Sequence, residues 1–240
     1  MSIRFVAVLP FALVLSALSA LHAQNTLVGR VDSGKYVSPT GAFRVSIPVL
    51  AQLGGSITDT DNVVTFQDDF NTHQSIACFK MDATQRWEEE TRGRRDYLIW
   101  FFSNFVQADF QQRFPGARIE SAHFLTDTQS GALLTYNLLP GGSMFASKVA
   151  LTGEEEPPVA KRGNLLFVKN GYVFVLSIEL AEKVLERASY EKTITEEDKI
   201  LRQRLLELLE RIGFSTPSAA APTEAGTTDP PQSPAAVPAK

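Results

Sequence analysis

The residues best suited to chemistry lie in one short segment, FQDDFNTHQSIACF, which spans residues 66–79. Its two adjacent aspartates raise the question of calcium, whose loop needs oxygen ligands at alternate positions, glycine at the sixth and glutamate at the twelfth. Counted from Asp69, the sixth position holds Gln74 and the twelfth holds Lys80. Because neither residue fits, the segment does not match a calcium-binding loop.

The same segment contains His73 and the chain's only cysteine, Cys78. A zinc site needs three or four His, Cys or carboxylate ligands in tetrahedral reach, and beyond residue 23 the one other histidine is His123. On a regular strand His73 and Cys78 point to opposite faces, which disfavours a nucleophilic pair. Cys78 lies among apolar neighbours, as an inert buried thiol does. The segment therefore predicts neither a metal site nor a nucleophile.

Turn formation explains the polar part of this segment better than catalysis does. Asp68, Asp69, Asn71 and Thr72 have side chains that bond to nearby backbone groups, which favours turns. We interpret the segment as strand–turn–strand. Asp68 and Asp69 remain candidate contacts for a partner, since a turn displays its carboxylates at the surface.

Other motifs give no stronger indication of catalysis. The segments GGSIT and GGSMF do not complete a G-x-S-x-G nucleophile elbow, and neither a P-loop nor a G-x-G-x-x-G pattern is present. The acidic run 154–156, which precedes two prolines, is typical of a solvated loop, with a paired-carboxylate site as the alternative. We predict no catalytic, cofactor-binding or metal-binding residue. The competing hypothesis is a hydrolase or other enzyme assembled in three dimensions around His123.

An aromatic run, YLIWFFSNFVQADF, covers residues 97–110. Aromatic residues at helical spacing usually form core, because large side chains dominate core energetics. Residues 97–102 are apolar on every side of such a helix, which is more than one buried stripe requires. Tyr97 and Trp100 are therefore candidates to line a pocket or to contact a partner.

The N-terminus has the pattern of a signal peptide. Arg4 precedes the apolar run FVAVLPFALVLSALSAL, and Ala23 offers the small side chain that signal peptidase needs before Gln24. We predict cleavage between Ala23 and Gln24 and a secreted or periplasmic protein without membrane attachment after cleavage. The single Cys78 excludes an intramolecular disulfide, so the domain must depend on burial.

Composition sets the limits of the folded domain. From Ser215 to Lys240 the chain is rich in Ala, Pro, Thr and Ser and has no hydrophobic periodicity, which predicts a disordered tail. Residues 24–214 then form one domain. The formal net charge is −4 and the basic residues are scattered among acids, whereas nucleic acid requires concentrated positive charge. We do not expect a nucleic-acid partner.

Inside the domain, strands dominate, and the strongest indication is a hairpin around Asn170-Gly171, the preferred pair for a type I′ turn. Apolar residues lie on both faces of its second strand, so something must cover each side of the sheet. Two helices are available, one from Thr84 or Trp87 to Phe114 and one with Thr195 as N-cap and Gly213 as C-cap. Further strands are predicted in GAFRVSIP, NVVTF, SIACFKM, ARIESAHFL, GALLTYNLL and SMFASKVAL.

These elements predict an α+β fold, with an antiparallel sheet of about six to eight strands sandwiched between two main helices. The order of elements, together with YVSPTGAFRVSIP at the entry and LLELLERIGF at the end, resembles the PsbP-like family over residues 36–214. The Asp68-Asp69 turn and a long loop at EEEPPVAKRG have no counterpart in that resemblance. It implies a fold used by exported proteins of diverse roles, many of which act through partners. We predict a non-enzymatic binding or accessory domain for an unknown protein or a small apolar ligand.

Overall fold

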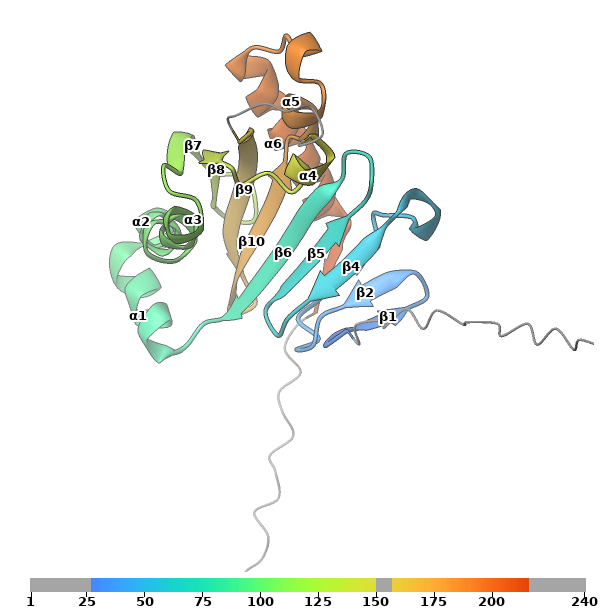
Figure 1. Cartoon of the computed structure of the whole chain (residues 1–240). Helices are drawn as coiled ribbons and strands as arrows, with labels where there is room; N and C mark the ends of the chain where they lie inside the picture. The colour runs from blue at the N-terminus through green and yellow to red at the C-terminus, as the bar shows by residue number, and fades with distance from the viewer. Residues whose placement is uncertain (1–26, 150–156, 216–240) are drawn as a thin grey trace, which may run out of the picture.

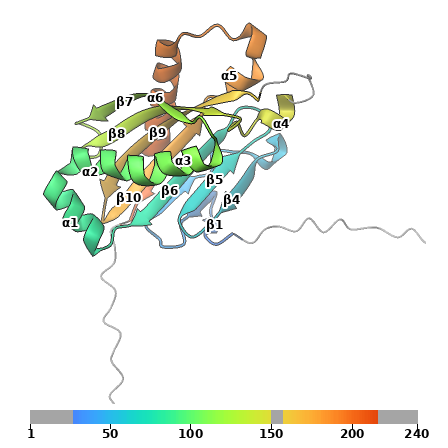
Figure 2. The same cartoon turned by 60° about the vertical axis from the view of Figure 1, so that its left-hand side comes forward.

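The computed structural model describes residues 27–149 and 157–215. The predicted signal peptide, its cleavage site at Ala23 and Gln24, the acidic run 154–156 and the predicted tail beyond Ser215 lie outside these residues. The described chain forms two antiparallel sheets, with helices on both sides of the larger one (Figures 1 and 2). The predicted α+β sandwich is confirmed.

The larger sheet has seven strands in the order β4-β5-β6-β10-β9-β8-β7, within the predicted six to eight. Its strands are β4 (Ser56–Asp59), β5 (Val63–Gln67), β6 (His73–Lys80), β7 (Arg118–Leu125), β8 (Ala132–Pro140), β9 (Val159–Lys169) and β10 (Tyr172–Glu179). The smaller sheet has the order β1-β2-β3-β11. Its strands are β1 (Arg30–Asp32), β2 (Lys35–Val37), β3 (Phe43–Ser46) and β11 (Ile212–Phe214).

The helices are shorter and more numerous than predicted. They are α1 (Ala83–Arg92), α2 (Arg94–Phe101), the π-helical turn η2 (Phe102–Val106), α3 (Gln107–Arg113), α4 (Ala146–Val149), α5 (Ala181–Leu185) and α6 (Ile194–Glu210), with 3₁₀ turns η1 (Ala51–Leu53) and η4 (Arg187–Ser189). Within residues 27–149 and 157–215, none of these helices has the length and apolar character needed to cross a membrane.

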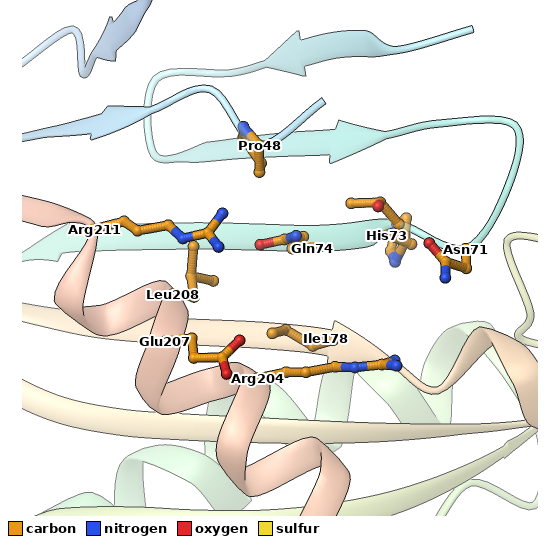
Figure 3. Close-up of a pocket in the computed structure, with 10 residues that line it drawn as sticks. Pro48, Asn71, His73, Gln74, Ile178, Arg204, Glu207, Leu208 and Arg211 are labelled. Atoms are coloured by element: carbon orange, nitrogen blue, oxygen red, sulfur yellow. The ribbon is translucent and has the colours of Figure 1, made fainter. Parts of the chain in front are cut away.

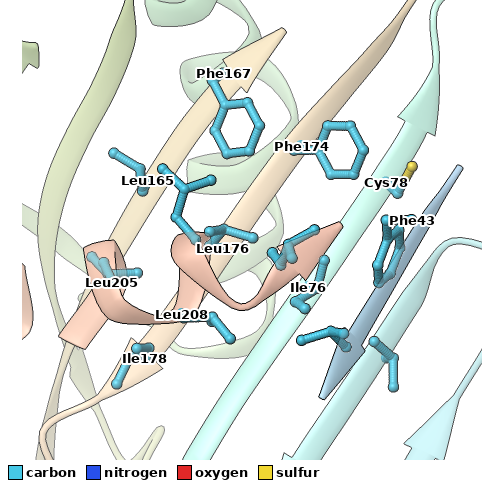
Figure 4. Packing of buried hydrophobic residues seen from close by; sticks show 14 of the residues in the cluster. Phe43, Ile76, Cys78, Leu165, Phe167, Phe174, Leu176, Ile178, Leu205 and Leu208 are labelled. Carbon is cyan, nitrogen blue, oxygen red and sulfur yellow. The ribbon is translucent and has the colours of Figure 1, made fainter. Parts of the chain in front are cut away.

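The predicted hairpin is confirmed, and it places apolar residues on both faces of the sheet. Asn170 and Gly171 have positive φ angles of 51° and 77°, as a type I′ turn requires. On one face, Phe174 and Leu176 pack with Leu205 and Leu208 of α6 and with Phe43 of the smaller sheet (Figure 4). Burial of this layer is the main stabilisation of the fold.

The opposite face of the sheet is covered by α2, η2 and α3, which lie across the strands (Figure 2). Val173 and Val175 of β10 pack there with Tyr97, Leu98 and residues of η2, as the alternation in β10 predicts.

The prediction of one helix over residues 84–114 is wrong at Gly93. This residue has φ 78° and ψ 158°, which ends α1 and starts α2 in a new direction. Such a conformation is accessible to glycine because it has no Cβ. The predicted end is confirmed, since α3 stops at Arg113 before Pro115 and Gly116.

The ends predicted for the last helix are also corrected. Thr193 rather than Thr195 is the N-cap of α6, because its hydroxyl accepts from the Glu196 backbone while the Glu196 carboxylate accepts from the Thr193 backbone. The C-cap is Arg211, and Gly213 lies inside β11, paired with Arg44. Pairing with β3 converts the predicted helix end into a strand.

Two further predictions are corrected near the chain's middle. Residues 143–149 of the segment SMFASKVAL are not a strand: residues 144–145 form a turn and α4 follows, and Phe145 is buried against Ala181 and Val184 of α5. The predicted loop EEEPPVAKRG is strand from Val159 onward, because β9 pairs with β8 from Val159 to Phe167.

Candidate functional site

A groove of about 760 Å³ lies between the larger sheet and the helical layer, and we call it the helix–sheet groove. Its floor is formed by residues of β4, β5, β6, β10 and β9 that face the helical layer, and its wall by α2, η2 and α3. Cavities that bind small molecules usually measure about 300–1,000 Å³ and combine apolar walls with a few polar groups. The lining residues are Thr58, Thr60, Asn62, Val63, Thr65, Gln67, His73, Ser75, Ala77, Phe79, Phe101, Phe105, Val106, Asp109, Phe110, Arg113, Met144, Arg162, Val175 and Ser177.

Strand register gives the floor of the groove a polar end and an apolar end. At one end Gln67 of β5 pairs with His73 of β6, and in the middle Thr65 pairs with Ser75. At the other end Val63 pairs with Ala77. Because alternate residues of a strand share a face, β5, β6 and β10 each present this gradient, whereas β4 and the turn after it add the polar residues Thr58, Thr60 and Asn62 at the outer edge. The groove is therefore amphipathic along its length.

The helical wall follows the same gradient. At the apolar end Phe101 packs against Phe79 of the floor, with ring centroids 6.0 Å apart. Phe105 lies 4.9 Å from Phe101 and keeps 48% of its surface exposed. Both residues border or belong to the π-helical turn η2, and such turns are frequent at functional sites. The wall ends at Asp109 and Arg113 of α3, which form an ion pair of 2.7 Å.

A buried amide network fixes the helical layer against the sheet. The Asn137 side-chain amide donates to Gln107 Oε1 of α3 at 2.6 Å, and the Gln107 amide donates to the Ala117 carbonyl at 3.2 Å. Asn164 donates to Asn137 Oδ1 at 2.9 Å and accepts from the Ser177 hydroxyl at 2.7 Å. Satisfied buried networks of this kind hold a unique packing arrangement. The network thus sets the distance between the helical wall and the floor.

At the polar end, Arg162 and Glu179 lie on neighbouring strands, paired in register. The Glu179 side chain is fully buried and accepts hydrogen bonds from Ser143 Oγ at 2.6 Å and from the Met144 backbone N–H at 3.1 Å. Arg162 Nη2 donates to the Gly142 carbonyl at 2.9 Å and lies 3.6 Å from Glu179 Oε2. Among the described residues, Arg162 Nε–H has no hydrogen-bond acceptor.

His73 completes the polar end and is held in its neutral form. Its side chain is 7% exposed, and Nδ1 lies 3.8 Å from Glu179 Oε2 without a hydrogen bond in the described structure. Burial, and after it the nearby positive charge of Arg162, lower the pKa of His73 from 6.5 to about 3. An imidazole with this pKa is a weak base near neutrality.

The polar end does not assemble an activated nucleophile in the described part of the chain. Ser75 and Ser177 share the groove floor with His73, yet no hydrogen bond joins either hydroxyl to the imidazole in the described structure. The Ser177 hydroxyl donates to Asn164 instead. Nucleophilic catalysis needs the hydroxyl and the base within hydrogen-bond reach. The geometry supports binding better than acyl transfer.

A second pocket, of about 250 Å³, lies on the α6 side of the sheet (Figure 3). Its lining includes His73 and Gln74 of β6 and Arg204, Glu207 and Arg211 of α6, so His73 borders both this pocket and the helix–sheet groove. The Arg204 guanidinium in this pocket is already paired, because it donates two hydrogen bonds to the Glu182 carboxylate. The smaller volume and the paired charge make this pocket a weaker candidate than the helix–sheet groove.

The interpretation of residues 68–72 as a turn is confirmed. Asp68 is 8% exposed, and its Oδ1 accepts from the backbone N–H groups of Phe70, Asn71 and Thr72 at 2.8–2.9 Å. These hydrogen bonds lower the pKa of Asp68 and outweigh the rise that burial would cause. Asp69 is exposed. Partner contact by this pair stays a prediction.

The aromatic run contributes to the groove through residues other than those predicted. Tyr97 is fully buried, with its ring 5.8 Å from that of Trp100. Trp100 is partly buried, edge-on to Phe105 at 5.5 Å and 5.6 Å below the Arg92 guanidinium. Neither Tyr97 nor Trp100 lines the groove, and their contact with a partner stays a prediction. Phe105 belongs to the same aromatic run, but the sequence did not show that it lines the groove, because its direction depends on the π-helical turn η2.

His123 lies far from Cys78, so the two residues do not form a catalytic pair. His123 is exposed on β7, an edge strand, and its ring packs edge-on to Tyr136 at 6.4 Å. Strands β8, β9 and β10 separate β7 from β6, which carries the buried Cys78. At about 4.8 Å per strand spacing, this distance is too great for a Cys–His pair. Within residues 27–149 and 157–215, no three His, Cys, Asp or Glu side chains gather closely enough to hold a metal ion.

Arg162 and Glu179 are site residues that the sequence analysis missed. Arg162 lies in a segment read as a loop, and Glu179 lies at the end of a hydrophobic strand. Nothing in their local sequence distinguishes them from solvated charges. The useful signal was their parity, which they share with Asn164 and Ser177 on the groove side of the same strands.

Comparison with known proteins gives similarity at the level of fold. No family model matches the chain, and no curated protein matches it significantly. The similar solved structures include a protein from Bacteroides thetaiotaomicron (10% identity, TM-score 0.40, 77% of this chain), of whose length this chain spans about half, 49%. They also include cyanobacterial PsbP from Synechocystis (12%, 0.45, 78% of this chain and 96% of that chain) and the yeast Ran-binding protein Mog1p (8%, 0.43, 77% and 96%). A PsbP protein is thus among the structures that this chain weakly resembles, as predicted.

Proposed function

We propose that this chain is an exported, non-enzymatic binding domain that holds a small, largely apolar ligand in the helix–sheet groove. The groove itself carries the proposal: about 760 Å³ of space, with phenylalanine side chains on the wall and hydroxyl groups on the floor. Apolar walls supply affinity through burial, and a few polar groups fix orientation. The satisfied amide network behind the wall supports a groove that exists before the ligand arrives.

Replacing Phe105 with alanine tests ligand binding directly. Phe105 is half exposed, so the substitution should change the free energy of unfolding by less than about 1 kcal/mol. It removes an aromatic face from the groove, and burial of such a side chain is worth enough to weaken binding by roughly tenfold or more. The measurement is a titration with N-phenyl-1-naphthylamine, a neutral probe whose fluorescence rises in apolar surroundings.

A matched control is Phe70→Ala. Phe70 is the same residue type and is 58% exposed, but it belongs to the β5–β6 turn and does not line the groove. Its substitution should leave probe affinity unchanged. Equal probe binding by wild type and both variants would place the bound probe outside the groove, and no probe binding by the wild type would refute the proposed function.

Export forms a separate part of the proposal, supported by the signal-peptide pattern of residues 1–23. We expect the exported protein to begin at or near Gln24, as determined by N-terminal sequencing. Leu13→Arg places a charge in the apolar run and should retain the protein, uncleaved, in the cell. Recovery of intact Met1 from a membrane fraction would contradict cleavage.

A further inference from the structure

We infer that the ligand of the helix–sheet groove is a single-chain amphiphile whose carboxylate is recognised by Arg162 at the polar end. This inference rests on the proposed function and specifies its ligand class. The evidence for this ligand class is that the groove has polar side chains toward one end and apolar side chains toward the other. His73, Arg162 and Ser177 lie toward one end, whereas Ala77, Phe79 and Val175 lie toward the other.

The unused donor of Arg162 explains why the head group should be an acceptor. Arginine has five N–H donors, and in the described structure one nitrogen, Nη2, has a carbonyl acceptor while Nε–H has none. The side chain is only 12% exposed, so water does not compensate the unpaired donor freely. Buried donors are rarely left unpaired in folded proteins. An acceptor at the end of the groove would complete this guanidinium.

A carboxylate fits this acceptor role better than a neutral group. The guanidinium fork matches the two oxygens of a carboxylate, and charge assistance makes such hydrogen bonds about twice as strong as neutral ones. Two acidic groups lie nearby: Glu179 lies 3.6 Å from Arg162 Nη2 and also accepts from Ser143 and Met144, and Asp109 pairs with Arg113. Glu179 therefore balances much of the charge of Arg162, but it leaves Nε–H without an acceptor, and this donor is the one that an incoming carboxylate would use.

His73 borders the same end and adds a neutral polar group. With its Nδ1 unpaired in the described structure and its imidazole uncharged, it accommodates a head group by donating or accepting one hydrogen bond. Beyond it, the apolar half of the groove offers Phe79, Phe101 and Phe105 to a hydrocarbon chain. Head and chain thus meet complementary surfaces at the same time.

The test compares two ligands that differ only in the head group. Dodecanoate and dodecan-1-ol, each below its aggregation threshold at pH 7.5, compete with N-phenyl-1-naphthylamine for the wild-type protein. One charge-assisted hydrogen-bonded head group should lower the apparent Kd of dodecanoate by roughly 10- to 100-fold relative to the alcohol. Equal affinities would overturn carboxylate recognition while leaving apolar binding intact. Probe binding without displacement by either ligand would overturn the ligand class, and absence of probe binding would refute the proposed function instead.

Variants assign the preference to Arg162. Arg162→Met keeps the aliphatic stem and should reduce the dodecanoate preference to about onefold, with the affinity for dodecan-1-ol unchanged. Arg113→Met is the control, because this arginine borders the same end but is 66% exposed and paired with Asp109. It should retain the preference within about threefold. An Arg162→Met protein that folds and keeps the full preference would overturn the assignment.

A second measurement uses the unmodified protein, in case Arg162→Met does not fold. The mature chain has two histidines, one at the groove and one on the far edge strand. Dodecanoate should shift the imidazole NMR resonances of His73 and leave those of His123 in place. Shifts at His123 alone, or at neither histidine while the ligand is bound, would place the head group elsewhere and overturn the inference.

Discussion

Replacement of Lys161 with methionine should lower the free energy of unfolding by about 3–5 kcal/mol, because it removes the buried cation that faces three carboxylates. The Lys161 side chain is fully buried in β9. Its ammonium lies 2.9 Å from Glu197 and 2.6 Å from Asp198, both at the start of α6, and it also forms an ion pair with Glu120 of β7. Urea unfolding at pH 7.5 measures the loss.

Lys183→Met is a matched control for this prediction. Lys183 contacts the same carboxylate, Glu197, at 2.7 Å, but its side chain is 30% exposed. Partly exposed ion pairs contribute little, so the expected loss is about 1 kcal/mol or less. Similar losses in the two variants would contradict the idea that full burial of Lys161 makes the difference.

The pH range of this stabilisation follows from the shifted pKa values. Burial lowers the pKa of Lys161, but the hydrogen bonds with Asp198, Glu120 and Glu197 raise it more, so the net pKa is raised. The contribution of a cation with a raised pKa is complete below its unfolded pKa, about 10.4, and is lost as the pH rises through the folded value. The Lys161→Met defect should therefore be constant across neutral pH.

The second large effect concerns acid. Between pH 8 and pH 4.5, we expect His73 to reduce the free energy of unfolding by about 3 kcal/mol. In the unfolded chain this histidine titrates near 6.5, whereas burial, followed by the charge of Arg162, lowers its folded pKa to about 3. Below pH 6.5 the unfolded state therefore binds a proton that the folded state does not. Acidification then favours unfolding, and the loss continues until the pH reaches the folded pKa.

His73→Phe should remove this dependence, because phenylalanine fills a similar volume and does not titrate. Urea unfolding at intervals from pH 8 to pH 4.5 gives the slope, which should be shallower in His73→Phe than in the wild type. His123→Phe replaces the exposed histidine of β7 and should keep the wild-type slope. A wild-type slope in His73→Phe would show that the acid sensitivity comes from other groups.

Much of the local structure followed from local sequence. The Asn170-Gly171 hairpin was predictable because its positive φ angles suit few other residue pairs. The turn at residues 68–72 was predictable because Asp68 can satisfy its own loop's backbone donors. The opposite placement of His73 and Cys78 followed from strand parity, and the structure confirms it: Cys78 belongs to the main core, near Phe43 of the smaller sheet, and His73 borders the groove (Figure 4).

The ends of the helices were harder to predict, because several nearby residues could serve as caps and local sequence patterns do not decide between them. Gly93 broke a helix whose flanking residues all favoured helix, and Thr193 displaced Thr195 as N-cap because Glu196 completed its capping box. Gly213 became part of a strand because β3 offered backbone partners to it. In each case a contact formed by the surrounding structure outweighed a small difference in local preference.

The sequence by itself therefore determined the α+β class, the pairing of adjacent strands and the faces of each strand, since these depend on periodicities within a few residues. Only the tertiary structure decided the candidate site. His73, Arg162 and Glu179 come from three strands and lie far apart in the chain, and they meet because β6, β10 and β9 align in one antiparallel register. Side-chain parity indicates the face of a strand on which a residue lies, but long-range pairing decides which strands become neighbours. Burial at that place then leaves the Arg162 Nε–H donor without an acceptor and lowers the pKa of His73.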